Sequence, residues 1–306
     1  MDFRPTDDQR AVRNGLRDLL ARRFPREELR AALERGTLDR GLWRALGDAG
    51  LFALRLPEAE GGVGLGLPEA VLLFEEAGRA LLPGPLVDTH LAAGTVKGAA
   101  EGEVVVTAQV GELIPHFADA DVVRDLEREA LARTVRPVRT VDPLTPLHRV
   151  PAGAAAPPEP SAESILLTAA EQAGSAARTV ELAVQHARTR EQFGQAVGAF
   201  QAVKHLCAQM LVRSEMARTA VHAAAVTGAG AEIAAAKLLA DEAAEHNARD
   251  CLQVCGGMGF TWESDVHLHL KRAWVRAARG PSRARLEREL ADALLTEPAG
   301  QPADQV

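Results

Sequence analysis

Residues 187–205 read ARTREQFGQAVGAFQAVKH, and this stretch decides how the C-terminal half of the 306-residue chain folds. One helix ends near Arg190, Gly194 breaks it, and Phe200 with Gln201 opens the next. Long runs with apolar residues at helical spacing stand on both sides of this break. The pattern therefore predicts two long helices joined by a tight turn.

The same turn carries groups that suit phosphate. A helix start offers unpaired backbone N–H groups and a positive dipole end, and Arg188 and Arg190 add bidentate donors. These groups could hold a pyrophosphate. They could also form a plain helix–turn–helix corner, since arginines are favourable at a helix C-terminus. The residues alone leave both interpretations open.

A second stretch, residues 253–270, reads QVCGGMGFTWESDVHLHL. Gly256, Gly257 and Gly259 permit positive φ and the close approach of another backbone or a phosphate, and Gln253 can hydrogen-bond both ways. No strand precedes these glycines, so they are not the dinucleotide-binding fingerprint. They predict either a phosphate contact or a tight turn between helices.

The histidines and cysteines of this region favour no metal site. His267 and His269 lie about 200° apart on a helix, on opposite sides, which is wrong for sharing one metal. Cys251 and Cys255 are four residues apart and are not a CxxC pair. Three cysteines in a chain of this length argue against a disulfide framework and predict small buried side chains in a reducing cytoplasm.

Composition excludes several classes of protein. The apolar fraction is 47% and the charged fraction 25%, which is typical of globular chains. The net charge of -7, with no long basic run, argues against a nucleic-acid partner. No run approaches the roughly 18 apolar residues of a membrane helix. The first residues, MDFRPTDDQR, lack the apolar stretch of a signal peptide.

The residue pattern changes twice along the chain, from helical to strand-like and back to helical. Residues 7–99 have helical patterns, including a predicted helix at about 38–49 and another that starts near Pro68. After residue 101, EVVVTAQV is strand-like, and ADVVRDL, ALARTV and LHRV are short apolar runs between turn residues. We therefore predict a helical domain (1–100), a shortened β-domain (101–152), a proline-alanine linker (153–161), a helical bundle (162–297) and a tail (298–306).

Both stretches quoted above resemble motifs of one family. REQFGQAVGAFQAVKH is similar to the arginine-x-x-phenylalanine-glycine motif of the acyl-CoA dehydrogenases, and QVCGGMGFT to their glutamine-x-x-glycine-glycine motif. LGDAGLFALRLPEAEGGVGLGLPEAVLLFEEAGRALLPGPL resembles the family's N-terminal helical domain. The resemblance covers residues 1–100 and 161–280. It implies a mainly α fold: an N-terminal helical domain, a reduced β insert, and a C-terminal four-helix bundle that also forms the oligomer interface.

The resemblance implies a flavin cofactor, FAD, whose ADP end reaches a neighbouring subunit. In the family the two motifs serve the neighbour's flavin. By resemblance, three residues of the first motif contact its pyrophosphate or adenine region, and three of the second close over it. These are Arg190, Phe193 and Gln201, then Gln253, Gly256 and Gly257.

The family oxidises an acyl-CoA to the 2,3-enoyl-CoA, and a carboxylate removes the α-proton while hydride leaves for the flavin. Counted without gaps from Gly256, the usual glutamate of that base falls on Gly280. In members that place the base on an earlier helix, the position falls on Ser164, beside Glu163. Glu163 is a candidate base only if the alignment slips by one residue. A solvated acidic residue near a helix start is the plainer interpretation.

A second departure from the family concerns the β-domain. Fewer than half of its usual residues fit between Glu101 and Pro151, and its flavin-contacting signatures have no counterpart. Some bacterial acyl-CoA dehydrogenases that act on steroid side chains have an α2β2 design, in which a shortened subunit completes the flavin site of a partner. GFTWESDVHLHLKRA looks like that shortened type.

The leading hypothesis is therefore a heterotetramer subunit that completes the FAD site of a longer subunit, which carries the base. An acyl-CoA would be the substrate and electron-transfer flavoprotein the acceptor. Two alternatives stay open: a self-sufficient homo-oligomeric dehydrogenase that uses Glu163, and a non-catalytic acyl-CoA-binding or scaffold protein.

Overall fold

The computed structural model describes residues 5–151, 153 and 156–296. The predicted tail (298–306) lies outside them, as do two positions of the predicted linker. The N-terminal part holds α1 (Asp7–Arg23), α2 (Arg26–Arg35), α3 (Arg40–Asp48), the short 3-10 turn η1 (Glu58–Glu60), α4 (Leu67–Arg79) and α5 (Leu86–Ala92). Within the described residues, no helix is long and apolar enough to cross a membrane.

Capping residues set the bounds of these N-terminal helices. Thr6 accepts a hydrogen bond from the Gln9 N–H, and the Gln9 side chain accepts one from the Thr6 N–H, so α1 begins with a capping box. The helix predicted at about 38–49 is α3, whose N-cap is Asp39. A further helix, α2, lies between its caps Pro25 and Gly36 and was not predicted as a separate element.

The middle of the chain forms a small β insert. β1 (Val106–Thr107) pairs in parallel with β3 (Val122–Val123). A separate antiparallel sheet has the order β2-β5-β4, with bounds β2 (Leu113–Pro115), β5 (Leu147–Arg149) and β4 (Arg136–Val138). The strands are shorter than the apolar runs suggested. The run ALARTV also differs from expectation, because its first residues finish the short helix α6 (Arg128–Ala132).

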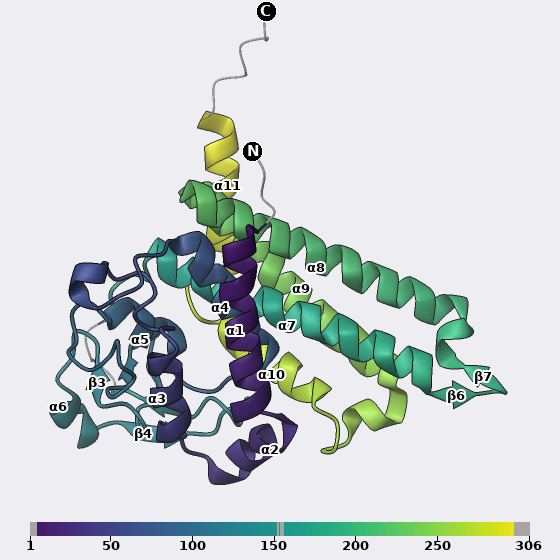
Figure 1. Cartoon of the computed structure of the whole chain (residues 1–306), viewed down its shortest axis with the longest axis horizontal. Coiled ribbons are helices and arrows are strands. Elements are labelled where there is room, and N and C mark those ends of the chain that lie inside the picture. The colour runs from purple at the N-terminus through teal and green to yellow at the C-terminus, as the bar shows by residue number, and fades with distance from the viewer. Residues whose placement is uncertain (1–4, 152, 154–155, 297–306) are drawn as a thin grey trace, which may run out of the picture.

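The C-terminal half is a bundle of long helices. It consists of α7 (Ala162–Thr189), α8 (Gln201–Thr227) and α9 (Gly230–Cys255), followed by the 3-10 turn η3 (Gly256–Phe260), α10 (Val266–Ala277) and α11 (Arg283–Thr296). The three longest helices lie side by side, and α10 packs on α7 and α9 (Figure 1). Alanines fill much of their contact, including Ala169, Ala173, Ala236 and Ala240. The predicted mainly α fold with a C-terminal four-helix bundle is confirmed.

The N-terminal helices join the bundle where α4 crosses α7. Gly78 and Gly174 lie in this crossing, and a Cβ atom added at Gly78 would come 1.9 Å from the carbonyl oxygen of Glu171. A Cβ at Gly174 would come equally close, 1.9 Å, to the carbonyl oxygen of Glu75. The two backbones therefore touch, which only glycine permits.

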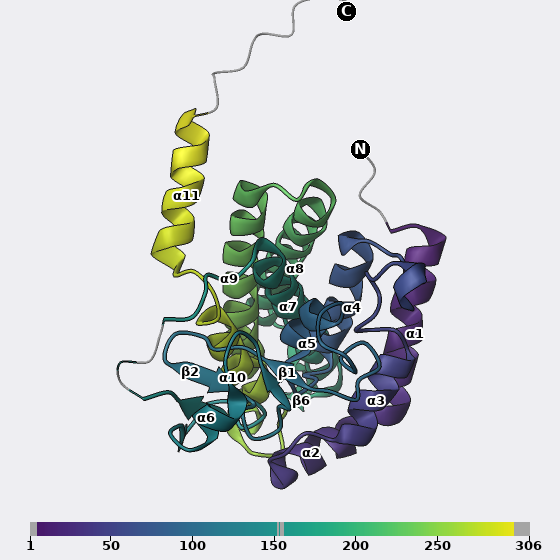
Figure 2. The same ribbon diagram turned by 90° about the vertical axis from the view of Figure 1, so that its left-hand side faces the viewer.

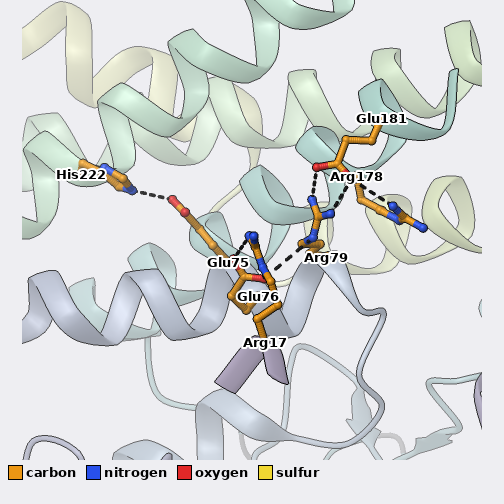
Figure 3. Close-up of polar contacts among 7 residues, drawn as sticks. All are labelled: Arg17, Glu75, Glu76, Arg79, Arg178, Glu181 and His222. Atoms are coloured by element: carbon orange, nitrogen blue, oxygen red, sulfur yellow. Dashed lines mark hydrogen bonds and ion pairs between the residues drawn. The ribbon is translucent and has the colours of Figure 1, made fainter. Parts of the chain in front are cut away.

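A polar network surrounds the same crossing (Figure 3). Two nearly buried neighbours on α4 reach in different directions: Glu75 contacts His222 of α8 at 2.7 Å, and Glu76 accepts from Arg17 of α1 at 2.8 Å. Glu181 of α7 is paired with both Arg79 and Arg178. Buried carboxylates are stable only when paired, so the contacts of Glu75 and Glu76 fix the register of α1, α4 and α8, and the exposed Glu181 links α7 to α4.

The β insert lies against α5 and α10, while α1, α2 and α3 lie on the far side of α5 (Figure 2). Its own small core contains Ile114, Phe117, Val123 and Val135. Two cavities described below lie along this contact between insert and helices.

Candidate functional site

The two sequence motifs meet at one end of the bundle. α7 ends at Thr189, a hairpin of β6 (Glu191–Gln192) and β7 (Gln195–Ala196) reverses the chain, and the 3-10 turn η2 (Val197–Ala199) leads into α8. Because α9 runs back alongside α8, its C-terminal glycines arrive at the same end (Figure 1). We call the six residues gathered there the motif surface: Arg190, Phe193, Gln201, Gln253, Gly256 and Gly257.

An apolar cluster beneath the motif surface holds the helix ends in place. Its buried members come from α7, α8, α9 and α10: Val180, Ala183, Ala187, Met210, Ala248, Cys251, Leu252, Val254, Val266 and Leu270. Cys251 thus behaves as a small buried hydrophobic side chain, with Cys207 and Cys255 partly buried against the cluster. The motif surface therefore stands on a packed base.

The hairpin at Phe193 has an unusual backbone. Phe193 and Gly194 both have positive φ, 54° and 78°, as a two-residue type I′ turn requires. Positive φ is unfavourable for a bulky residue such as phenylalanine. The Phe193 residue is nevertheless 90% exposed, and its ring meets the Phe200 ring edge to face, with 6.0 Å between the centroids. The fold of this chain gains little from an aromatic ring at this position.

The polar groups of the motif surface are uncommitted. Arg190, Gln201 and Gln253 are exposed, and in the described part of the chain none of their side chains makes a hydrogen bond or ion pair. By contrast, Arg213 on α8 is bound to Asn247 and Asp250. The donors of the motif surface are therefore free for an anionic ligand.

The glycines of the motif surface leave room for such a ligand. Gly256 has φ 59°, a conformation that favours glycine. No atom of the described chain lies within 4 Å of a Cβ built on Gly256 or Gly257. The space in front of both residues is therefore open, and another molecule could approach their backbone closely.

The positions expected for the catalytic base lie elsewhere and share one cavity. Gly280 and Ser164 both line a cavity of about 90 Å³ between the β insert and the start of α7. Gly280 has φ 118°, and its nearest neighbour is the Ile165 side chain, 3.9 Å from a built Cβ. Neither a glycine nor a serine hydroxyl can serve as the carboxylate base of the family's reaction.

Sequence reasoning missed a buried carboxylate in this cavity. Asp88 of α5 lines it, is 1% exposed, and accepts a hydrogen bond from Arg279. Burial alone would lower the pKa of the Arg279 guanidinium, but the charge of Asp88 raises it above its ordinary value. The signal was available as a lone acid in the apolar run LVDTHLA, although the sequence does not show which residue it would meet.

Glu163 is occupied by a different contact. It lies in the first turn of α7, where Ser161 caps the helix, and accepts a hydrogen bond of 2.7 Å from Arg55. That hydrogen bond holds the pKa of Glu163 below its ordinary value. A carboxylate that stays ionised and paired in this way is a weak proton acceptor.

The two histidines of α10 lie apart, as expected from their spacing. His269 is buried and contacts the Ser175 hydroxyl at 2.7 Å, and burial lowers its pKa to about 3. His267 packs instead against the Trp262 ring, with 4.9 Å between centroids. Within the described residues, no three histidine, cysteine or acidic side chains are grouped to hold a metal.

Comparison with known proteins agrees with this architecture. Residues 6–101 match the acyl-CoA dehydrogenase N-terminal domain, and residues 163–287 match the C-terminal domain. The acyl-CoA dehydrogenase IpdE2 of Mycobacterium tuberculosis is 35% identical over 88% of this chain and 92% of its own length. The chain belongs to the acyl-CoA dehydrogenase family. It is thereby placed among oxidoreductases that act on acyl-CoA thioesters.

Solved structures share the fold of this acyl-CoA dehydrogenase. A steroid acyl-CoA dehydrogenase variant, Tcur3481-Tcur3483, superposes with a TM-score of 0.80 at 23% identity, covering 94% of this chain and 98% of the other. A chain of the ChsE4-ChsE5 complex from Mycobacterium tuberculosis gives 0.80 at 21% identity, covering 98% of this chain and 100% of the other.

Proposed function

We propose that this chain is the shortened subunit of a hetero-oligomeric acyl-CoA dehydrogenase and completes the FAD site of a longer partner subunit. Together the two subunits would oxidise an acyl-CoA to its 2,3-enoyl-CoA. One observation carries the proposal: the motif surface offers uncommitted donors to the outside, whereas the expected base positions in the chain's own cavity are Gly280 and Ser164.

The residues of the motif surface suit the ADP end of a flavin. When bound, FAD supplies the hydride acceptor of the family's reaction. Arg190 would donate to its pyrophosphate, beside the N-terminal dipole end of α8. Phe193 would pack its exposed ring against the cofactor, and the open space at Gly256 and Gly257 would admit it against the backbone.

The longer partner would provide the carboxylate base and the main flavin platform, and electron-transfer flavoprotein would accept the electrons. Large apolar side chains next to the motif surface support a covering partner. Met258, Phe260 and Trp262 are 56%, 76% and 65% exposed, a concentration of apolar surface that marks interaction sites. We propose a steroid side-chain CoA thioester as the substrate, on the analogy of the steroid acyl-CoA dehydrogenase above.

Each alternative function meets an obstacle in the structure. A self-sufficient enzyme using Glu163 would need that carboxylate free, but Arg55 holds it. A non-catalytic scaffold would have no use for uncommitted donors and a strained phenylalanine at one exposed surface. Both obstacles favour the shared-site proposal.

The experiment is to co-express the chain with a longer acyl-CoA dehydrogenase subunit and to measure FAD affinity of the purified complex. Loss of a hydrogen bond to a charged group costs about 1.5–3 kcal/mol, so Arg190→Met should weaken FAD binding roughly 10- to 100-fold. Arg44→Met, which removes an exposed arginine on α3, serves as the matched control and should leave the affinity unchanged. Equal affinities for the two variants would contradict the proposal.

A further inference from the structure

A second cavity, of about 290 Å³, lies between α5, the antiparallel sheet and α10. Its walls are mainly apolar and include Leu86, Val87, Leu113, Pro115 and Val275. No residue of the motif surface lines it. The volume of this cavity lies just below the usual range of small-molecule pockets, about 300–1,000 Å³. We call it the arginine cavity, for the reason that follows.

Three arginines line this cavity from one helix and the turn after it. Arg272, Arg276 and Arg279 are spaced four and three residues apart, so they share a face. Each has an acidic partner: Arg272 pairs with Asp142, Arg276 donates to Glu171 at 2.7 Å, and Arg279 pairs with Asp88. Glu171 lines the cavity, whereas Asp142 and Asp88 are not among its lining residues.

Two of these guanidinium groups are not fully satisfied. Arg272 and Arg276 are 3% and 6% exposed, and each has one buried nitrogen, Nη2 and Nη1 respectively, without a hydrogen-bond partner among the described residues. A buried unsatisfied donor costs about 1–3 kcal/mol, and more on a charged group. Burial, together with the charge of Arg272, lowers the pKa of Arg276 to about 10, while its pair with Glu171 acts in the opposite direction.

We propose that the arginine cavity is a binding site for a small apolar carboxylate, whose oxygens accept from Arg272 and Arg276 while its hydrocarbon part contacts the apolar walls. The unsatisfied nitrogens of Arg272 and Arg276 belong to charged groups that line the cavity, so a charged acceptor is favoured over a neutral or cationic ligand. His116, the remaining ionisable lining residue, stays neutral because burial lowers its pKa. The inference does not depend on the proposed function.

Binding to the full-length chain, or to its complex with a partner subunit, tests the site. Sodium octanoate is the probe and octan-1-ol the neutral control, with affinity measured by titration calorimetry. Octanoate should bind with a stoichiometry of one per chain, and octan-1-ol at least roughly 10-fold more weakly, as expected for a lost charge-assisted hydrogen bond. Equal binding of octanoate and octan-1-ol would mean that the arginines do not recognise the carboxylate. Binding of neither probe would mean that water suffices for the two nitrogens. Either result would overturn the proposal.

Two variants assign the binding to this cavity. Arg276→Met should abolish octanoate binding, whereas Arg285→Met, at an exposed ion-paired arginine of α11, should not. Because Arg276→Met leaves Glu171 unpaired and could unfold the chain, Ala278→Phe is the second variant: Ala278 is exposed and lines the cavity, so the larger side chain blocks it without breaking an ion pair. Octanoate binding that survives Ala278→Phe would place the ligand elsewhere and refute the site.

Discussion

At the scale of single residues, Phe193 illustrates a side chain whose position the fold of its own chain does not explain. Its backbone occupies a conformation that is unfavourable for an aromatic residue, and its ring is nearly fully exposed. Backbone strain of this kind is common at binding sites, where the bound molecule benefits from a fixed side chain. The strained backbone and exposed ring of Phe193 therefore directly support the binding of an external ligand or partner at this position.

We predict that Phe193→Gly stabilises the isolated chain and weakens the complex. Removal of the unfavourable φ should raise the free energy of unfolding by about 1 kcal/mol, measured by urea denaturation. The same variant should retain less FAD in the complex. Gly194→Ala is the control, because it introduces strain at φ 78° and should destabilise the chain. A Phe193→Gly complex with normal FAD content would argue against a role for the ring.

For Glu163, in contrast to Phe193, we predict that substitution has little effect on the activity of the complex. Glu163→Gln should leave the turnover of the complex within about twofold of the wild-type rate and cost less than about 1 kcal/mol of stability, since its pair with Arg55 is partly solvated. Its pKa is lowered in the folded state, so this small contribution is present at neutral pH and is lost as the pH falls through the folded pKa. A steady-state assay that shows no turnover of the Glu163→Gln complex would contradict this prediction and support Glu163 as the base.

At the scale of elements, the α4–α7 crossing determines how the N-terminal helices sit on the bundle. We predict that Gly174→Ala forces the two backbones apart and destabilises the chain by about 1–3 kcal/mol or more, because its Cβ would lie 1.9 Å from the Glu75 carbonyl oxygen. Gly15→Ala in α1, where a Cβ meets nothing within 4 Å, should instead stabilise it by about 0.5–1 kcal/mol. Thermal unfolding that ranks the two variants the other way would contradict the crossing.

Helices were predicted well from sequence because their signals are local. Gly194 and Gln201 mark the break between α7 and α8, and Pro68 marks the start of α4, each beside its helix in the sequence. Strands of the β insert were predicted less well, because pairs such as Val106 with Val122 depend on contacts distant in sequence. The first residues of the run ALARTV pair with no strand among the described residues and form the end of a helix instead.

The candidate site likewise contains residues that local sequence motifs predicted and residues that they did not. Arg190 and the glycines at 256 and 257 were found because each motif is contiguous in sequence, and the bundle topology then brings the motifs to one end. Contiguous motifs could not reveal the pair of Asp88 with Arg279 or the cavity lined by Arg276. Each combines residues almost two hundred positions apart, which come together because α5 and α10 both pack against α7.

At the scale of the whole molecule, the chain combines the outward-facing motif surface, which we propose to be half of a flavin site, with a reduced β insert. On this proposal, a second molecule supplies the rest of the cofactor's surroundings. The cavity with Gly280 and Ser164 offers no carboxylate at either expected base position. The account therefore predicts that flavin binding and dehydrogenase activity belong to the assembled complex.

The most direct test is the flavin content and activity of the chain purified alone and after co-expression with a longer acyl-CoA dehydrogenase subunit. Absorbance near 450 nm gives the flavin-to-protein ratio, and dye-linked oxidation of an acyl-CoA gives the activity. The account predicts a colourless, inactive preparation of the chain alone and a yellow, active complex. A yellow homo-oligomer that oxidises acyl-CoA without a partner would contradict it.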